Sequence, residues 1–220
     1  MRLIRYSVCF FLILFALQSY GQKTISEGTI VYDIDIQGKD KDGKNTGLNS
    51  AKNILYLKGG LSRTDMVSAL GNETTIHNAK TGNAVILKEY SGQKLMITLN
   101  KNNWAVRNKK FGDIKFENTA ETKVLQGYTC KQAVAKLEDG STITVYYAPD
   151  LNLMNKDYNQ AFKNLSGFPM EYEFETKKMK FKCTVSRIDL DPIASVKFDF
   201  PKSGYRVMTY DENKQGRKEE

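Results

Sequence analysis

The chain has 220 residues and a formal net charge of +8, and 40% of its residues are hydrophobic. This length suits one domain with a sizeable core, and the lysines alternate with acidic residues rather than forming a concentrated basic stripe, which argues against nucleic acid as a partner. The chain has 1 histidine, and two cysteines lie beyond its first 21 residues, which is too thin a ligand set for a typical metal site.

The first 21 residues have the features of a secretory signal peptide. Two arginines precede an apolar segment at 8–17, which is too short to span a bilayer. Small residues follow it, so we expect cleavage between Gly21 and Gln22 and a periplasmic or secreted mature protein. An uncleaved anchor is the alternative. Removal of the two arginines lowers the net charge from +8 to +6.

Period-two alternation predicts the strands of the first half. Isoleucines and Tyr32 alternate with aspartates over 27–37, which indicates a half-buried strand. Residues 38–50 are polar and rich in glycine, which predicts a loop. The other strands expected here are joined by tight turns, as in an antiparallel meander. They are 53–58, 61–67, 74–78, 83–90 and 94–99.

Segment 100–112 breaks this pattern, and a loop, a short helix or an irregular strand all fit it. Strands are expected to follow, and glutamates at 171–175 would face lysines at 178–182 across a hairpin, where opposite charges help set the register. The strands expected in this half are 113–126, 128–137, 142–147, 170–175, 178–185 and 196–200.

One helix is predicted, at 151–165. Its apolar residues recur at helical spacing, at Leu151, Met154, Tyr158, Phe162 and Leu165. The last residues of the chain are polar, so we expect one domain at 22–208 and a disordered tail at 209–220.

Two cysteines, Cys130 and Cys183, belong to the expected mature chain. An even number in an oxidising compartment suggests a disulfide, and both lie in strand-like segments with apolar neighbours on the same face. Two buried free thiols are the competing interpretation.

Catalytic motifs are nearly absent. His77 is the only histidine, so any triad would have to use it, and its context favours a strand surface over an active site. Neither a phosphate-binding glycine loop nor a pair of closely spaced cysteines occurs. We therefore expect a protein that is not an enzyme and needs no cofactor or metal. An enzyme whose site is built from dispersed residues is a third-ranked alternative.

The predicted elements also limit the shape of the domain. A sheet with one apolar face must close on itself, pack on a second sheet, or be covered by helices. With one amphipathic helix available, a half-open barrel plugged by that helix is expected, and such a barrel can enclose an apolar cavity. In the alternative, the aromatic side chains simply pack together.

Four segments carry a family resemblance: EGTIVYDIDI at 27–36, LYLKGGLSRTDM at 55–66, GYTCKQAVAKLEDGSTITVYYAPDL at 127–151 and LSGFPMEYEF at 165–174. In this order they resemble an uncharacterised family of exported proteins of Bacteroidota, and they are similar to GLPGLI-type proteins. Both families look like members of the LolA/LolB-like superfamily of periplasmic lipoprotein carriers.

This resemblance implies a mainly β, LolA-like fold: a strongly curved antiparallel sheet that forms an unclosed half-barrel around an apolar cavity, plugged by helices. It also implies that Arg63 helps hold a lid, and we expect helix 151–165 to be that lid. The leading hypothesis is a non-catalytic periplasmic protein that binds an apolar or lipid-like ligand, such as lipoprotein acyl chains. The expected cavity residues are Tyr32, Ile34, Tyr56, Tyr158, Phe162, Tyr172, Phe174, Phe181 and Phe198.

The alternative function is an envelope protein–protein interaction module with a packed core and no ligand. The expected partners are accordingly a hydrophobic ligand or a lipidated protein, with envelope proteins or an anionic membrane surface as further candidates.

Overall fold

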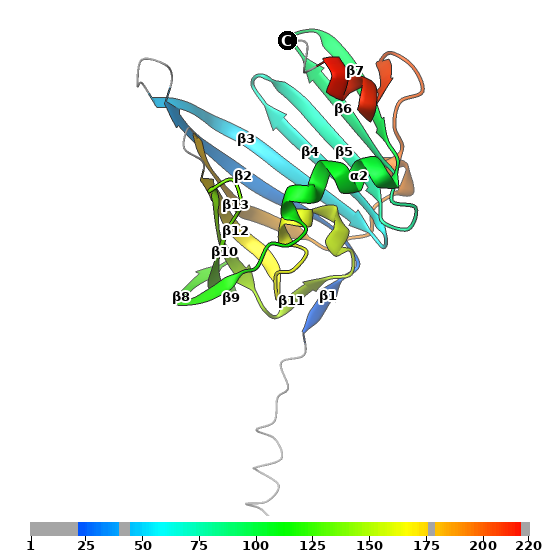
Figure 1. Ribbon diagram of the computed structural model, residues 1–220. Coiled ribbons are helices and arrows are strands. Elements are labelled where there is room, and N and C mark those ends of the chain that lie inside the picture. Colours follow the sequence, from blue (N-terminus) through cyan, green and yellow to red (C-terminus); the bar gives the residue numbers. More distant parts are fainter. Residues whose placement is uncertain (1–21, 40–44, 176–178, 217–220) are drawn as a thin grey trace, which may run out of the picture.

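The computed structural model describes residues 22–39, 45–175 and 179–216, so the predicted signal peptide at 1–21 lies outside the described residues. Most of the chain is β-strand (Figure 1). The strands are β1 (Lys23–Ile25), β2 (Glu27–Lys39), β3 (Asn45–Lys58), β4 (Leu61–Ser68), β5 (Gly71–Asn78), β6 (Ala84–Tyr90), β7 (Gln93–Leu99), β8 (Glu117–Leu125), β9 (Tyr128–Lys136), β10 (Thr142–Ala148), β11 (Leu151–Leu153), β12 (Phe168–Glu175), β13 (Met179–Asp189) and β14 (Arg206–Thr209).

One 12-stranded sheet dominates the fold, with the strand order β14-β7-β6-β5-β4-β3-β2-β13-β12-β10-β9-β8. Neighbouring strands are antiparallel except β14 and β7, which run parallel. The sheet curves strongly, and among the described residues its edge strands β8 and β14 do not pair with each other (Figure 1). The predicted fold class, an unclosed and strongly curved β-sheet, is therefore confirmed. β1 and β11 form a separate parallel pair.

Tight turns connect the hairpins as their sequences predict. Between β8 and β9, Gln126 and Gly127 both have positive φ, at 49° and 80°, and Ser91 and Gly92 between β6 and β7 have 51° and 77°. Positive φ at both central residues is the type I′ geometry, whose twist matches that of the flanking strands.

Residues that pair directly across strands point to the same side, so the register separates two faces. The inner face is lined by Ile30, Leu55, Thr64, Thr75, Ile86 and Ile97, each opposite the next. The outer face carries the neighbouring row Tyr56, Arg63, Ile76, Val85 and Thr98.

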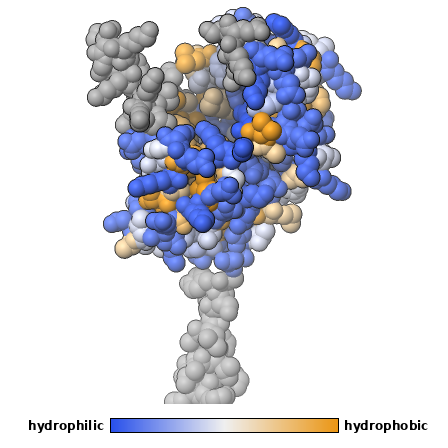
Figure 2. All heavy atoms as spheres, in the orientation of Figure 1, coloured by the Kyte–Doolittle hydropathy of each residue, from blue (hydrophilic) through white to orange (hydrophobic). Residues whose placement is uncertain are grey.

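Short helical elements cover the inner face (Figure 1). They are α2 (Lys101–Asn108), η1 (Lys109–Phe111), η2 (Lys156–Tyr158) and η3 (Gln160–Phe162). Trp104 of α2 packs on a cluster that contains Ile86 and Ile97, and Phe162 of η3 is buried in the main core with Tyr32 and Tyr172. Figure 2 shows that, from this side, apolar residues reach the surface only as small patches among hydrophilic ones.

A connection from β13 to β14, residues 190–205, crosses the outer face, and we refer to it as the strap. It contains η4 (Ser195–Phe198). Lys58 Nζ donates to Ile193 O at 2.7 Å, and Arg63 Nη1 donates to Lys197 O at 3.0 Å. Lys197 Nζ in turn lies 4.2 Å from the centre of the Tyr56 ring. These contacts fix the first half of the strap to β3 and β4.

The predicted helix at 151–165 is wrong. Its first residues form β11, in which Leu151 and Leu153 are both buried, and the rest forms the 3-10 turns η2 and η3. Asn155 and Asn159 explain the difference, since their side chains accept hydrogen bonds from the backbone two residues on. Such local bonds compete with a continuous helix.

Three other boundaries differ from prediction. Residues 196–200 contain η4 instead of a strand. The chain from 209 does not begin a disordered tail, because Tyr210–Gly216 forms α3 after β14. The predicted loop at 38–50 is shorter than expected, since β3 begins at Asn45, and residues 40–44 lie outside the described residues. At 100–112, the short helix among the three alternatives is the one present, as α2.

The predicted disulfide is not formed, and both cysteines are free and buried. Cys183 shares the inner face with its register partner Tyr172. Cys130 lies two residues before Gln132 in β9, so the two side chains point to the same face. The Gln132 amide donates to the Tyr146 hydroxyl on the outer face, which places Cys130 on that face as well. The two strands are also three positions apart in the sheet, or about 14 Å at ~4.8 Å per strand, well beyond the reach of a disulfide.

Candidate functional site

The structure divides the nine predicted cavity residues among three places. Tyr32, Tyr158 and Tyr172 line a pocket on the inner face. Four others belong to the main core or pack against it: Ile34, Phe162, Phe174 and Phe181. Tyr56 and Phe198 lie on the outer side of the sheet, with the strap. The half-barrel interior is therefore mostly filled, and one continuous apolar cavity is not what these residues form.

The pocket on the inner face, which we call the inner pocket, has a volume of about 170 Å³. Tyr32 Oη donates to Pro169 O at 2.8 Å, and the rings of Tyr32 and Tyr172 meet edge-on at 5.7 Å. Burial raises the pKa of Tyr32, Tyr158 and Tyr172 well above the ordinary value, so all three phenols stay neutral. More than half of the lining residues are polar, and they include asparagine, glutamine and arginine side chains from α2 and the 3-10 turns.

Arg63 does not contact a lid over the interior. Its Nε forms an ion pair with Asp65 Oδ1 at 2.8 Å, and its Nη1 reaches the backbone of Lys197. Thr74 Oγ1 donates to the same Asp65 oxygen at 2.8 Å. Arg63 therefore anchors the strap to the outer face, which corrects its predicted role as a contact of segment 151–165.

His77 is buried, with 3% of its surface exposed, and the prediction of a surface position is wrong. Its ring stacks on Trp104 of α2 with centroids 4.4 Å apart. Burial lowers the pKa of His77, while the negative charge of Asp157 acts in the opposite direction. His77 thus serves as a platform for α2.

A second opening is a groove of about 720 Å³, which we call the outer groove. The outer-face residues Ile76 and Val85 form its floor, and Phe198 and Phe200 of the strap form a wall. It continues around the end of the sheet to the starts of α2 and α3. The full lining is Leu61, Ile76, Asn78, Thr81, Asn83, Ala84, Val85, Thr98, Leu99, Asn100, Asn103, Phe198, Phe200, Thr209 and Asp211.

The outer groove combines an apolar centre with a nearly uncharged polar rim. Of the residues that the structure describes, Asp211 is the only charged one in its lining. The rim amides are partly engaged already, because Asn100 and Asn103 cap α2 reciprocally, with Asn103 N donating to Asn100 Oδ1 at 2.9 Å. A volume of several hundred cubic ångströms, apolar walls and a few polar groups are typical of small-molecule sites.

Sequence reasoning missed most residues of this groove. The predicted cavity residues include Phe198 but not Phe200. Ile76 and Val85 point outward, because the next residues along their strands, His77 and Ile86, face inward. Alternation predicts only one apolar face for a strand, so it does not indicate an apolar groove on the outer face. The polar rim comes from turns and helix starts, which no motif marks.

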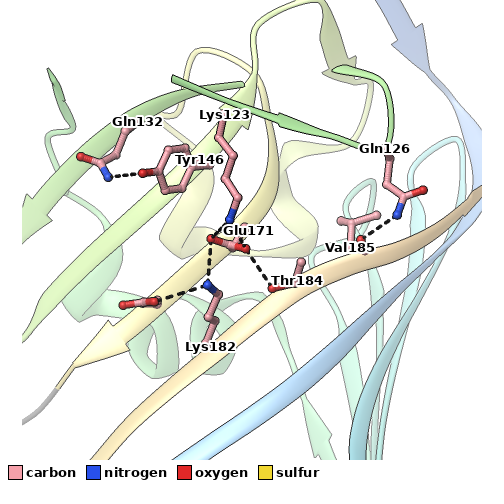
Figure 3. A network of polar contacts seen from close by, with 9 residues as sticks. Lys123, Gln126, Gln132, Tyr146, Glu171, Lys182, Thr184 and Val185 are labelled. Carbon is pink, nitrogen blue, oxygen red and sulfur yellow. Dashed lines mark hydrogen bonds and ion pairs between the residues drawn. The ribbon is translucent and has the colours of Figure 1, made fainter. Parts of the chain in front are cut away.

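A charged cluster around Glu171 lies on the outer side of β12 (Figure 3). Lys123 Nζ contacts both carboxylate oxygens at 2.9 Å, Lys182 Nζ contacts one at 3.1 Å, and Thr184 Oγ1 donates at 3.2 Å. Lys180 and Glu173 pair at 2.7 Å along the same hairpin. The predicted facing of glutamates and lysines across β12 and β13 is therefore confirmed.

Burial alone would raise the pKa of the Glu171 carboxyl, but the hydrogen bonds and charges of Lys123 and Lys182 outweigh it and hold this pKa below the ordinary value. The negative charge is thus retained and compensated. A carboxylate with two lysine partners is suited to fixing the sheet and poorly suited to accepting a proton.

Within the described part of the chain, no helix has the length and apolar character that a membrane span requires. The described residues also contain no group of three or more histidine, cysteine or acidic side chains that could hold a metal ion.

Neither a scan against models of protein families nor a search of curated proteins finds a match. Solved structures do match. PNGF-II is 15% identical, with a TM-score of 0.51 over 86% of this chain and 33% of that chain. This chain therefore spans about a third of the PNGF-II chain, and the likeness shows a shared fold only.

Two further structures are more distant. An uncharacterized conserved protein from Thermus thermophilus is 10% identical, with a TM-score of 0.44 over 91% of this chain and 99% of that one. The lipoprotein LppX of Mycobacterium tuberculosis is 11% identical, with a TM-score of 0.34 over 76% of this chain and 88% of that one.

Proposed function

We propose that this protein is exported and binds an apolar or lipid-like ligand in the outer groove, without catalysing a reaction. The observation that carries the proposal is the groove itself, which offers about 720 Å³ between an apolar sheet face and the phenylalanines of the strap. Each methylene that a ligand buries there would contribute about 0.8 kcal/mol.

The ligand class follows from the lining. The apolar centre suits an alkyl or acyl chain, and the asparagines and threonines of the rim suit a polar group at its end. Its described lining contains no lysine or arginine. A free lipid and a lipidated protein both fit this class of ligand, since both present the same apolar acyl chain.

The proposal that the protein is not an enzyme rests on how the candidate groups are used. His77 stacks on Trp104, and Glu171 is neutralised by two lysines. Both cysteines are buried thiols whose pKa burial raises to about 11, which disfavours the reactive thiolate.

The test is native mass spectrometry with lipid extraction on residues 22–220, purified from a periplasm without detergent. A reproducible lipid adduct is expected. Phe200→Asp should reduce it at least about tenfold, because a charge in an apolar wall is costly. Val196→Asp is the matched control, since Val196 is 71% exposed on the same strap and does not line the groove. A bare mass that is unchanged after incubation with phospholipid vesicles would overturn the proposal.

The second candidate function is a protein–protein interaction module. The filled interior favours it, since the inner pocket has only about 170 Å³. If the lipid experiment gives a bare mass, this candidate becomes the leading one, and crosslinking in intact cells would identify the protein partner.

A further inference from the structure

The inner pocket lies on the opposite side of the sheet from the floor of the outer groove, and no described residue lines both. Its walls come from β2–β5, β12 and α2, and from the 3-10 turns η2 and η3 with Asn159 between them. The lining includes Asn53 and Thr64 from the sheet, Trp104 and Arg107 from α2, and Tyr158 from η2. Elements that are distant in the sequence thus converge on one small space.

Two polar atoms of residues in this wall are buried without a hydrogen-bond partner in the part of the chain that the structure describes. They are Asn53 Oδ1, an acceptor, and Trp104 Nε1, a donor. Buried polar atoms in folded proteins are almost always hydrogen-bonded, because an unsatisfied one carries its full desolvation cost. A ligand that accepts from Trp104 and donates to Asn53 would satisfy both.

Among the described residues, Arg107 is the only charged one that lines the inner pocket. Its Nη2 lies 3.8 Å from Glu73 Oε1, while Lys88 Nζ is closer to that carboxylate, at 3.1 Å. Glu73 is therefore neutralised without Arg107, and the guanidinium side chain is 36% exposed. Trp104 and Arg107 stand three residues apart on α2, which places them as neighbours on one side of the helix.

We propose that the inner pocket is a second binding site, for a small carboxylate that also carries a hydroxyl group. The carboxylate would accept from the Arg107 guanidinium and from Trp104 Nε1, and the hydroxyl would donate to Asn53 Oδ1. The aromatic walls of Tyr158 and Tyr172 enclose the carbon skeleton. A cavity of about 150 Å³ accepts benzene, so about 170 Å³ limits the ligand to roughly six to eight non-hydrogen atoms.

Trp104 is the only tryptophan in the chain, so its fluorescence reports directly on this pocket. We would titrate residues 22–220 with lactate, glycolate and 2-hydroxybutyrate, and with propane-1,2-diol as the uncharged counterpart of lactate. A saturable change in emission is expected for at least one acid, with affinity in the millimolar range or better, and binding of the diol should be at least about tenfold weaker.

Arg107→Gln should weaken acid binding at least about tenfold and leave the response to the diol unchanged. Arg187→Gln is the matched control, an exposed arginine on β13 that does not line the pocket. Phe200→Asp, which targets the outer groove, should leave the titration unchanged.

Equal binding of lactate and the diol, or an unchanged acid affinity in Arg107→Gln, would overturn the assignment of a carboxylate. Absence of a saturable response to all three acids would overturn the site. The readout is independent of lipid binding, so failure here and failure of the proposed function are distinguishable.

Discussion

The charged cluster of Figure 3 gives the sharpest test of the fold, through the substitution Glu171→Gln. The Glu171 side chain is 6% exposed and accepts from Lys123, Lys182 and Thr184. Hydrogen bonds to a charged group contribute about 1.5–3 kcal/mol each. The two lysine side chains are 40% and 36% exposed, so solvent screening reduces their share. Glutamine has the same size as glutamate and keeps one acceptor oxygen. We therefore expect the substitution to lower the free energy of unfolding by about 2 kcal/mol at pH 7.

This loss should depend on pH with a definite sign. The pKa of the Glu171 carboxyl is lower in the folded protein than in the unfolded chain, so the unfolded chain binds the proton first as the pH falls. The contribution of the charge is therefore complete above the unfolded value, near pH 4.3, and is lost as the pH falls through the folded value. The difference in the free energy of unfolding between wild type and Glu171→Gln should become smaller over that range.

Urea unfolding followed by circular dichroism, at pH 7 and at the lowest pH that leaves the wild type folded, measures both quantities. Glu175→Gln is the control, since Glu175 is exposed on the same strand and should change stability by no more than about 0.5 kcal/mol. A gap for Glu171→Gln that is equal at both pH values would refute the electrostatic reasoning and assign the loss to packing.

Three further outcomes are expected. Protein denatured without reductant should take up one alkyl group on each of Cys130 and Cys183, and a recovered disulfide would contradict their placement on opposite faces. The native protein should resist alkylation at pH 8, because burial raises the pKa of each thiol to about 11. An NMR titration should place the pKa of His77 below 6.5, so that stability is complete above about pH 6.5 and falls as the pH drops through the folded value. His77→Phe should remove that slope, and an unchanged slope would assign it to other groups. Phe162→Ala should lower the free energy of unfolding in urea by about 3–5 kcal/mol, since the Phe162 ring is buried with its centroid 4.7 Å from that of Tyr172. A decrease of less than about 1 kcal/mol would show that η3 is not part of the core.

The strands could be predicted wherever the two sides of a strand differ in polarity. In β12 and β13, glutamates and lysines occupy one side and apolar residues the other, and the observed pairs Glu173–Lys182 and Glu175–Lys180 follow from that pattern. In β2, Tyr32 and the isoleucines beside it are buried as their alternation with aspartates predicts.

The segment 151–165 shows how a helical pattern fails. Its apolar spacing fits a helix, but the same residues are buried by other geometry, with Leu151 and Leu153 alternating in β11 and Phe162 packed from η3. The side chains of Asn155 and Asn159 start two separate turns, and this local hydrogen bonding outweighs the stripe.

The candidate sites could be predicted only in part, because half of the sheet is covered on both faces. In β6, Ile86 packs inward below Trp104, while Val85 and Leu87 pack outward in a separate cluster with Tyr205. Apolar residues then occupy both sides of the strand, and alternation no longer indicates which side is the interior. The inward prediction for Tyr56 is wrong for this reason, since its neighbour Leu55 holds that position.

Coverage of both faces also determines where a long ligand can bind. The inner face is filled by α2 and the 3-10 turns, which leaves about 170 Å³. On the outer face the strap is anchored near Lys197 by Arg63 and at Tyr205 by a hydrogen bond to Glu89. Between these anchors, Phe200 lines both the outer groove and a second groove of about 440 Å³. Phe200 is 47% exposed, so it separates the two grooves without being part of the core. A ligand chain that extends from the outer groove into this second groove has to displace Phe200, so Phe200→Ala should extend the range of bound chain lengths upward.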